Sequence, residues 1–494
     1  MTTSTKAQAE PVAETSTAKL PLCVDLDGTL VKIDTMQEAA FGSAVADWLV
    51  LLRIPVWLGI GKAHLKQQLA TRWQFDPAHL PYNDTLLDYL RMERARGRRI
   101  ALTTAAPQQV AQRIAAHLGL FDQVIASDGV TNLRGRAKAE VLRRSFGQKR
   151  FIYVGNDSTD HAVWREAAAA VIVNPHRGVL RAAKARYPNV TIIDSGASRI
   201  QAAVKALRPY QWVKNLLTFV PLLASGGLAD RDAWTATMAI FAAFCALASA
   251  IYILNDISDL AADRAHPRKR RRPFASGALT IGEGLAMVPG LALIGLALGW
   301  YSGALPALLL YAAMSLSYNF KLKEMPLIDV FVLGGLYTVR LFGGGEASGH
   351  DVSLWLLGFS SFLFLSLALV KRVSELHRLP PDRGRGLARR GYLHEDMMIL
   401  QMMGAASSFT SALVLSLYVQ SDTAVHAYAQ PTLLWGSVPL MLFWQCRLWL
   451  STARGYMQDD PIVYAARDWV SWLVLFCLIV LALGAYIPFK ALGH

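Results

Sequence analysis

Long apolar stretches, separated by short polar segments, fill the second half of the chain from Trp212 onward. Most of them approach the roughly 20 residues that a helix needs to cross a bilayer. The pattern predicts about nine spanning helices, at 212–225, 234–254, 284–300, 304–320, 326–345, 352–370, 397–420, 431–449 and 469–489. We therefore expect an all-α, multi-span membrane domain at 208–494, in contact with the lipid bilayer.

The first half of the chain has a different pattern. Residues 20–195 alternate between short apolar runs, typical of buried strands, and helical segments. This alternation predicts an α/β domain with a doubly wound, Rossmann-like parallel sheet. Residues 31–98 are helical in pattern and long enough for a small helical cap. Within the cap, Trp57 and its apolar neighbours are expected to pack in the core, with contact to substrate or to the membrane as the alternative.

Two segments outside these domains are polar. Residues 1–19 are rich in Ala, Thr, Ser and Glu and have no apolar core, which predicts a disordered tail and not a signal peptide. Residues 196–207 are predicted to form a short linker between the two halves.

Basic residues are distributed one-sidedly among the predicted loops. If the N-terminus is cytoplasmic, the cytoplasmic loops are 256–283, 321–325, 371–396 and 450–468. These loops contain most of the Lys and Arg of the membrane half, whereas the opposite loops and the C-terminal tail carry only Arg231 and Lys490. The positive-inside rule then predicts a multi-pass protein of the cell's inner (plasma) membrane, with its N-terminal domain in the cytoplasm.

The net charge of +14 is compatible with nucleic-acid binding, but basic cytoplasmic loops and contact with anionic lipid explain it more simply. No nucleic-acid partner is expected. The four cysteines are widely scattered, which indicates neither a disulfide framework nor a zinc site. They are Cys23, Cys245, Cys446 and Cys477.

Three acids follow the second apolar stretch, where the chain leaves the membrane. Asp256, Asp259 and Asp263 are spaced three and four residues apart, so their carboxylates are predicted to share one helix face. Acids at a membrane boundary are costly without a cation, and Mg²⁺ prefers carboxylate oxygens and substrate phosphates. A basic run at 264–272 follows at once, which predicts a site for a magnesium-complexed diphosphate. The alternative is an ordinary charged cytoplasmic loop.

Further polar residues interrupt the later apolar stretches. Arg340 lies deep in one of them, where an unpaired cation is expensive, and Asp329 precedes it by three helical turns. The two residues are expected to share a face and to serve one cavity, unless Arg340 is only the structural partner of a nearby acid. Lys371 and Arg372 stand at a helix end, where ordinary positive-inside charge is the alternative.

The segment Asn255–Asp263, with Arg272-Pro273 downstream, resembles the signature of the UbiA superfamily of intramembrane prenyltransferases, and the resemblance covers about 205–494. Its members typically have nine helices and bind a magnesium diphosphate. The chain lacks the full second Asp-rich motif of the aromatic prenyltransferases. The segments 208–215, 266–270, 322–329 and 371–372 instead resemble the decaprenyl-phosphate phosphoribosyltransferase branch, which transfers 5-phosphoribose from phosphoribosyl diphosphate to a polyprenyl phosphate.

The resemblance implies roles for these residues. Mg²⁺ on the three acids would stabilise the diphosphate leaving group, and cations would bind the acceptor phosphate. The residues expected to bind substrate are Lys214, Asn255, Lys269, Arg272, Tyr318, Lys323, Asp329, Arg340, Lys371 and Arg372. One alternative is transfer of a prenyl group from prenyl diphosphate to an aromatic or other small acceptor. A non-enzymatic transporter or lipid-binding scaffold is a third reading.

The first half begins with Asp25-Leu26-Asp27-Gly28-Thr29 after an apolar run, which resembles motif I of the haloacid dehalogenase (HAD) phosphatase superfamily over about 20–195. The resemblance implies that Asp25 is the nucleophile, a catalytic residue that also ligates Mg²⁺, and that Asp27 is the general acid and base. Thr104, with Thr103 as the alternative, and Lys138 are expected to bind the phosphate. The alternative for Lys138 is a solvated helix charge.

The metal motif of this half departs from the HAD pattern. Its usual Gly-Asp pair is Gly155-Asn156 here, with Asp157 one place later and Asp160 in position. Either Asn156 binds the metal through its carbonyl, or Asp157 takes over, or metal binding is weakened; we predict Asp157 and Asp160. The fusion suggests a bifunctional enzyme whose phosphatase domain dephosphorylates the transferase product.

Overall fold

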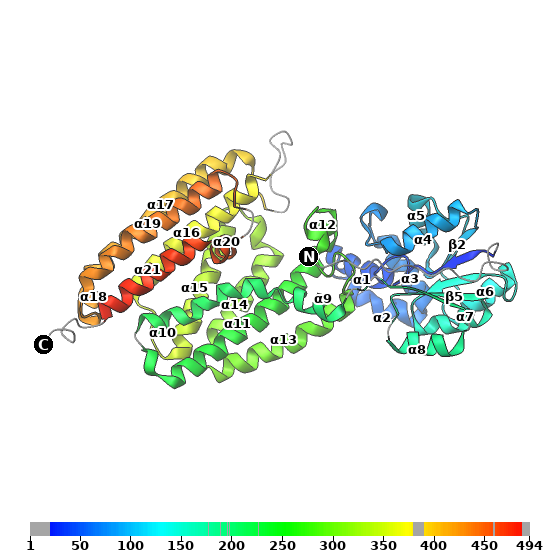
Figure 1. Cartoon of the computed structure of the whole chain (residues 1–494), viewed down its shortest axis with the longest axis horizontal. Helices are drawn as coiled ribbons and strands as arrows, with labels where there is room; N and C mark the ends of the chain where they lie inside the picture. The colour runs from blue at the N-terminus through cyan, green and yellow to red at the C-terminus, as the bar shows by residue number, and fades with distance from the viewer. Residues whose placement is uncertain are drawn as a thin grey trace. The chain divides into compact units, whose positions relative to one another are not determined.

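The computed structural model describes residues 20–486 except 176, 188, 195, 197, 226, 379–389, 458 and 459. The predicted tail at 1–19 lies outside the described residues, as do Arg389 and Lys490. The chain divides into two compact units (Figure 1). Unit 1 comprises Met1–Ala206 and Ile253–Ala286, and unit 2 comprises Leu207–Tyr252 and Met287–His494.

A six-stranded parallel sheet forms the centre of unit 1 (Figure 1). The strand order is β3-β2-β1-β4-β5-β6, so the first strand lies in the middle and the chain winds outward in both directions. This confirms the predicted α/β domain with a parallel sheet. The strands are β1 (Leu22–Val24), β2 (Ile100–Pro107), β3 (Gln123–Ser127), β4 (Ile152–Gly155), β5 (Ala169–Val173) and β6 (Val190–Ile193).

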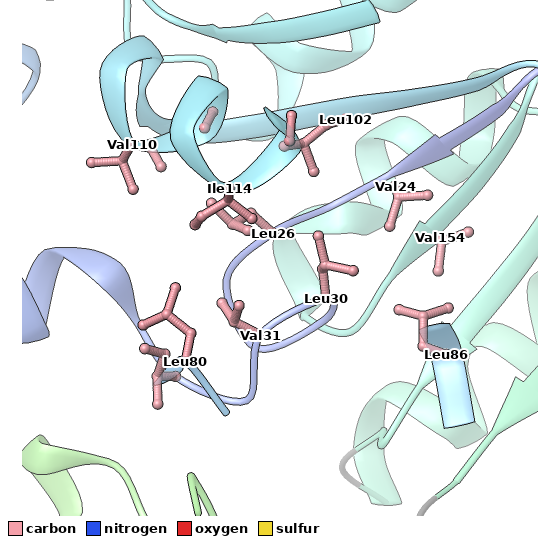
Figure 2. Close-up of a cluster of buried hydrophobic side chains, with 14 of the residues drawn as sticks. Val24, Leu26, Leu30, Val31, Leu80, Leu86, Leu102, Val110, Ile114 and Val154 are labelled. Atoms are coloured by element: carbon pink, nitrogen blue, oxygen red, sulfur yellow. The ribbon is translucent and has the colours of Figure 1, made fainter. Parts of the chain in front are cut away.

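Helices cover both faces of this sheet. They are α4 (Asp84–Ala95), α5 (Gln108–Leu118), α6 (Arg136–Phe146), α7 (His161–Glu166) and α8 (Arg177–Arg186), with α9 (Arg199–Ala206) after the last strand. Successive strand residues point to opposite faces, so Val24 and Val154 pack with Leu26, Leu30 and Ile114 in one core cluster (Figure 2). Alternate strand residues, including Cys23 and Tyr153, pack with Trp164 in a second cluster.

A helical insertion between β1 and β2 matches the predicted cap. It contains α1 (Thr35–Ala46), α2 (Val50–Ile60), α3 (Lys62–Arg72) and the 3₁₀ turn η1 (Pro77–His79). The Asp34 side chain accepts hydrogen bonds from the backbone N–H groups of Met36 and Gln37, which caps α1 and fixes where it starts. Trp57 packs against the core but is only partly buried. The apolar residues on the opposite side of α2 do not pack there.

Unit 1 also contains the acid motif. This segment includes the end of α11 (Arg231–Ser258), then α12 (Leu260–Ala265), η5 (Lys269–Arg271) and the start of α13 (Ile281–Tyr301). The buried Arg264 guanidinium donates to both carboxylate oxygens of Glu38 on α1, at 2.9 and 2.7 Å. Arg264 Nε donates to the Ala275 carbonyl at 3.2 Å, and Gly282 N donates to Gln37 Oε1 at 3.1 Å. The acid motif is therefore tied to the cap by buried, charge-assisted hydrogen bonds.

Unit 2 is helical. Its remaining elements are η3 (Pro209–Phe219), α10 (Val220–Ala224), η4 (Gly227–Ala229), α14 (Leu305–Phe320), η6 (Leu322–Glu324), α15 (Ile328–Ser348), α16 (Leu354–Leu376), η8 (His394–Asp396), α17 (Met397–Val419), α18 (Asp422–Ala427), η9 (Pro431–Gly436), α19 (Ser437–Ala453), α20 (Pro461–Arg467) and α21 (Trp469–Tyr486). Helices α15, α16, α17, α19 and α21 pack in succession (Figure 1).

Six helices in the described part of the chain are long and apolar enough to cross a membrane, so the nine predicted spans are not confirmed. The predicted span at 212–225 divides into η3 and the five-residue α10. The span at 304–320 is the 16-residue α14, and the one at 431–449 starts with η9 before the 17-residue α19. Proline lies at the first turn of each of η3, α10, α14 and η9, where it starts a new helical segment.

Small residues bring helices of unit 2 close together. A Cβ at Gly344 of α15 would lie 1.9 Å from the Thr218 carbonyl oxygen of η3. A Cβ at Gly404 of α17 would lie 2.0 Å from the Trp449 ring of α19. Only glycine permits these approaches, which are typical of helix packing in membrane proteins. The first contact places η3, with Lys214 and Asn215, against the helix that carries Arg340.

Candidate functional site

Asp25 follows β1 directly, at the carboxyl edge of the central strand. Its backbone N–H donates to the Val154 carbonyl of β4 at 2.9 Å, which fixes the residue between the two middle strands. Asp25 Oδ1 accepts hydrogen bonds from Leu26 N at 2.9 Å and from Lys138 Nζ at 2.8 Å. The two ionic side chains are almost completely buried. Lys138 of α6 is therefore part of the site and not a solvated helix charge.

A chain of hydrogen bonds continues from Lys138 to the metal motif. Lys138 Nζ donates to the Tyr153 hydroxyl at 2.9 Å, and that hydroxyl donates to Asp160 Oδ1, also at 2.9 Å. Asp160 Oδ2 accepts from the backbone N–H groups of Asn156 and Asp157, at 3.0 Å each. Sequence reasoning missed Tyr153; the available signal was a hydroxyl-bearing residue within the buried strand that leads into this motif.

Asn156 reaches the turn that carries Asp27. Gly28 has φ +70°, and a Cβ there would lie 2.4 Å from Asn156 Nδ2, so the turn requires glycine on both counts. Thr29 Oγ1 donates to Asn156 Oδ1 at 3.2 Å. Asp27 Oδ1 accepts from Thr35 N at 2.8 Å, at the first turn of α1. The side chain of Asn156 thus lies directly against motif I.

Asp157 makes a different set of contacts. Its Oδ1 accepts from the backbone N–H of Ser158 at 2.6 Å, its Oδ2 accepts from Thr159 Oγ1 at 3.3 Å, and Arg134 approaches Oδ2 to 3.7 Å. The carboxylate therefore caps the short turn after β4. Of the two residues that could replace the usual aspartate, Asn156 is the one whose side chain touches motif I.

The threonines of β2 are both fully buried, in the middle of the strand. Thr104 Oγ1 accepts from Ala106 N at 2.9 Å, whereas Thr103 Oγ1 donates to the Val24 carbonyl at 3.4 Å. Lys66, from α3 of the cap, donates to the Ala105 carbonyl at 2.8 Å and so adds a cation that sequence reasoning missed. No local pattern around Lys66 indicated this position, because the contact depends on how the cap folds back.

Burial controls the ionisation of this site. Desolvation raises the pKa of Asp25, although the nearby Lys138 ammonium opposes this shift. Desolvation, reinforced by the charge of Asp34, also raises the pKa of Asp27. Burial, together with the Asp25 charge, raises the pKa of Asp160 to about 6. Burial lowers the pKa of Lys66. A pKa of Asp27 above its usual value suits a general acid that must be protonated before it donates.

The acid motif lies in the other part of unit 1. Arg272 Nη1 contacts Asp256 Oδ1 at 3.1 Å and Asp263 Oδ2 at 2.6 Å. Asp256 and Asp263 are each 2% exposed. The helix is interrupted between them, because the backbone of Asp259 departs from helical angles and separates α11 from α12. The predicted single helix face is therefore broken at Asp259, while the outer two acids converge on one guanidinium.

For Asn255 and Lys269, the other predicted residues of this segment, the contacts described are those of the backbone. The Asn255 carbonyl accepts from Asp259 N at 2.9 Å and from Ser258 Oγ at 2.9 Å, which holds the helix end. Lys269 is exposed in η5, where its backbone N–H donates to His266 Nδ1 at 3.3 Å.

In unit 2, two predicted lysines meet a carboxylate that sequence reasoning missed. Lys214 Nζ lies 2.6 Å from Asp460 Oδ2, and Lys371 Nζ lies 3.6 Å from the same oxygen. The Tyr337 hydroxyl donates to Asp460 Oδ1 at 3.5 Å. Asp460 precedes α20 in a polar loop, where only a search for acids matching the excess of cations could have singled it out.

Arg340 lies close to this cluster. Its guanidinium carbon is 5.9 Å from the centre of the Tyr337 ring, and Lys214 Nζ is 5.8 Å from that centre. Arg340 Nε donates to Asn215 Oδ1 at 2.8 Å, and Arg340 Nη2 donates to the Tyr311 hydroxyl at 3.3 Å. The structure thus brings Arg340 together with two cations of the predicted substrate site.

Asp329 has other partners than Arg340. Its carboxylate contacts Arg372 Nε at 2.7 Å, both side chains are 0% exposed, and the Tyr392 hydroxyl also donates to it. Arg372 Nη2 donates to the Tyr318 hydroxyl at 3.1 Å. Lys323, in η6, is buried as well. Although Asp329 and Arg340 share helix α15, they belong to separate networks.

Together these features define the class of protein: a membrane-embedded helical domain with a carboxylate and arginine motif, joined to an α/β domain with a phosphatase-like site. The UbiA prenyltransferase family matches residues 216–466, and the haloacid dehalogenase-like hydrolase family matches residues 22–165. The chain belongs to the UbiA prenyltransferase family, an integral membrane family, and has an N-terminal HAD-like hydrolase domain.

Three relatives illustrate the range of similarity. Protein y4nM of Sinorhizobium fredii is 38% identical over 463 residues, covering 92% of this chain and 89% of that protein. Nodulation protein NoeC of Azorhizobium caulinodans is 35% identical over 285 residues, covering 57% of this chain and 91% of that protein. Decaprenyl-phosphate phosphoribosyltransferase of Corynebacterium glutamicum is 38% identical over 210 residues, covering 41% of this chain and 60% of that enzyme.

Solved structures match each half separately. A UbiA homologue from Archaeoglobus fulgidus bound to DMAPP and Mg²⁺ matches with a TM-score of 0.44 at 14% identity, covering 56% of this chain and 98% of that one. Phosphoserine phosphatase in its apo form matches with a TM-score of 0.26 at 17% identity, covering 35% of this chain and 92% of that one.

Proposed function

We propose that this enzyme transfers 5-phosphoribose from phosphoribosyl diphosphate to a polyprenyl phosphate, and that its HAD-like domain then removes the 5-phosphate of the lipid product. The observation that carries the first step is the gathering of Lys214, Arg340 and Lys371 around Tyr337 and Asp460 in unit 2. A phosphate acceptor requires such cations, whereas an aromatic acceptor does not. The similarity to decaprenyl-phosphate phosphoribosyltransferases supports the same choice.

The acid motif fits a magnesium diphosphate. Among the described residues, no three His, Cys, Asp or Glu side chains are gathered so as to hold a metal ion by themselves. Mg²⁺, however, commonly uses one or two carboxylates together with substrate phosphates. Asp256 and Asp263, which converge on the Arg272 guanidinium, offer those two carboxylates at a place already built for positive charge. Asp259 lies between them in the chain, at the interruption between α11 and α12. When bound, the ion would neutralise charge on the departing diphosphate.

The transfer step needs one bond to form and one to break. An oxygen of the lipid phosphate bonds to the anomeric carbon of ribose as the bond from that carbon to the diphosphate breaks. Lys214, Lys371 and Arg340 would bind and orient the acceptor phosphate, and Arg272 would contact the leaving diphosphate. Tyr318 and Arg372, with Lys323 and Asp329, support the cytoplasmic ends of α14 and α16 in the orientation that loop charge predicts.

The HAD-like site fits Mg²⁺ through oxygen donors of Asp25 and Asn156, since Asn156 Oδ1 faces motif I. Asp160 then acts by holding the backbone of the Asn156 loop, and Asp157 remains the alternative ligand. The ion would offset the charge of the bound phosphate when present.

In the hydrolysis step, a carboxylate oxygen of Asp25 bonds to phosphorus as the bond between phosphorus and the ribose oxygen breaks. Asp27 donates its proton to the departing ribose oxygen, and Lys138 neutralises charge beside the nucleophile. Water then attacks the phosphorus of the aspartyl-phosphate, Asp27 takes the proton of that water, and inorganic phosphate leaves. The products are a polyprenyl-phosphoryl ribose and phosphate.

The test supplies purified enzyme in lipid nanodiscs with Mg²⁺, a polyprenyl phosphate and ribose-labelled phosphoribosyl diphosphate. The proposal predicts label in the extracted lipid, and at least a hundredfold slower labelling with Asp256→Asn. A parallel tube contains a prenyl diphosphate and an aromatic acceptor. Consumption of the prenyl diphosphate, with no ribose label in lipid, would instead establish the prenyltransferase reading.

A further inference from the structure

Helix α2 of the cap carries apolar residues on both its inner and its outer face. Val50, Ile54 and Trp57 recur every three to four residues and turn toward the core of unit 1. The opposite face carries Leu52, Val56 and Ile60, each 65% exposed. A helix on the surface of a water-soluble domain normally has polar residues on its outer face. The composition of α2 therefore indicates that its outer face contacts another apolar surface.

The apolar surface is widened by further residues of α2 and continues before the start of the helix. Leu51 and Leu58 flank the outer face, and Trp48, just before α2, is 67% exposed. Arg53 is the helix's one charged residue, and its guanidinium is 4.0 Å from the Asp47 carboxylate. A contiguous apolar patch of this kind marks a site of contact with a partner or a membrane.

Basic and aromatic residues border the patch. Arg53 lies on the helix, Lys62 starts α3, and the Arg72 guanidinium lies 4.8 Å from the centre of the Trp57 ring. Tryptophan at the rim and Lys or Arg at the border are typical of helices that lie in a bilayer surface containing anionic lipids. The outer face offers no side-chain hydrogen-bond donors or acceptors between Leu51 and Ile60 other than Arg53, so it lacks the polar contacts that specify a protein partner.

Helices α2 and α3 form a helical hairpin, and this hairpin also reaches the phosphatase-like site. After Gly61, α3 turns back along α2 and buries Leu65 and Leu69 in the core. Between these two residues, Lys66 donates to the Ala105 carbonyl at the end of β2 and to Asn132 Oδ1 at 3.1 Å. Helix α2 is thus apolar and exposed, while α3 places the Lys66 ammonium against the backbone of β2.

We propose that α2 inserts its outer face into the headgroup region of the bilayer and so holds the HAD-like site at the membrane surface. The occupant of the patch is the lipid bilayer. The consequence that the site receives a lipid-borne phosphate rests on the proposed function, whereas the insertion itself does not. The cap then adds a membrane contact of its own to a domain that is already tied to the acid motif through Arg264 and Glu38.

The first experiment measures the depth of α2 without any substrate. The full chain carries Cys446→Ser and Cys477→Ser, which leaves the buried Cys23 and Cys245. A fluorophore is attached at Leu52→Cys or Val56→Cys, or at Met92→Cys, a 55%-exposed position on α4, as the matched control. Each protein is placed in nanodiscs of phosphatidylcholine and phosphatidylglycerol with nitroxide-labelled lipid.

The proposal predicts that lipid nitroxide quenches the labels at 52 and 56 several-fold more than the label at 92, and that a water-soluble quencher gives the reverse order. Equal quenching at all three sites would overturn it. Protection at 52 and 56 from both quenchers would overturn it too, because protein and not lipid would then cover the patch.

The second experiment joins the insertion to catalysis. Leu52→Glu combined with Val56→Glu, both at exposed positions, is compared with Met92→Glu. Activity on a water-soluble phosphomonoester should be unchanged in both proteins. Hydrolysis of polyprenyl-phosphoryl 5-phosphoribose in vesicles should fall about tenfold only in the double variant, as expected when two apolar side chains lose their insertion. Equal lipid hydrolysis by the two proteins would contradict the anchoring role. If no protein hydrolyses the lipid, the proposed function fails, while the quenching result still decides the insertion.

Discussion

Unit 1 contains two sites with carboxylates, and in each of them a cation of the chain itself contacts the acids. In the phosphatase motif, Lys138 contacts Asp25; in the acid motif, Arg272 contacts Asp256 and Asp263. The cations differ in exposure. The Lys138 side chain is 5% exposed and is shared with Tyr153, whereas the Arg272 side chain is 27% exposed.

The difference in exposure between Lys138 and Arg272 indicates that the two cations have different roles. A buried lysine with two partners is costly to move, because its departure would leave the buried Asp25 carboxylate without its counter-charge. On the proposed function, an arginine at the rim of its site would move away at lower cost if Mg²⁺ and diphosphate bound there. The HAD-like site is therefore the preorganised one, whereas we propose that the guanidinium of the acid motif is a displaceable counter-ion.

The largest effect is expected for the preorganised site. Asp25→Asn should lower phosphomonoester hydrolysis by roughly 10³-fold or more, since the nucleophile is lost while the residue size is kept. Phosphoribosyl transfer should be unchanged in the same protein. Asp128→Asn, on an exposed loop, is the control for a carboxylate outside the site. Loss of both activities in Asp25→Asn would mean that the sites are not independent.

For the acid motif, Asp256→Asn or Asp263→Asn should lower the transfer rate by roughly 10²- to 10³-fold, because each removes a carboxylate from the place of the metal. Hydrolysis of a soluble phosphomonoester is the internal reference. Asp232→Asn, at the exposed start of α11, should behave as wild type in both assays. Wild-type transfer by Asp256→Asn would show that the acids are ordinary loop charge.

A third pair extends the comparison to unit 2. Asp329 and Arg372 are both completely buried, so Asp329→Asn leaves a guanidinium with less compensation and should lower the free energy of unfolding by about 3 kcal/mol. Thermal unfolding of the protein in detergent measures this change against Asp351→Asn, at an exposed position. An unchanged melting temperature, combined with weaker binding of polyprenyl phosphate, would assign the pair to the substrate site instead.

The smallest effect concerns Tyr153, which connects Lys138 with Asp160. Tyr153→Phe removes one hydrogen bond from each and should lower hydrolysis about tenfold, equivalent to the roughly 1.4 kcal/mol of one well-made bond. The decrease should appear in kcat more than in KM, since the hydroxyl positions groups and does not bind substrate. Tyr89→Phe, on α4, is the matched control, and an equal decrease there would remove the special role of Tyr153.

The sequence predicted most of unit 1, because parallel strands and the motifs at their ends are encoded locally. Lys138 contacts Asp25, so the structure brings together two residues that the resemblance implied for one site. Tyr153, Lys66 and Asp460 were missed because their roles depend on contacts between distant segments, such as the cap folding back on β2. The number of spans was not confirmed because hydropathy does not register the prolines that divide an apolar stretch into short segments.

The central claim is that one chain first transfers a phosphoribosyl group and then removes its phosphate. The most direct measurement uses phosphoribosyl diphosphate with a carbon label in ribose and a phosphorus label in the 5-phosphate. Wild-type enzyme should give a lipid that keeps the carbon label while the phosphorus label appears as inorganic phosphate. Asp25→Asn should keep both labels in the lipid. A wild-type lipid that retains both labels, or that carries neither, would contradict the account.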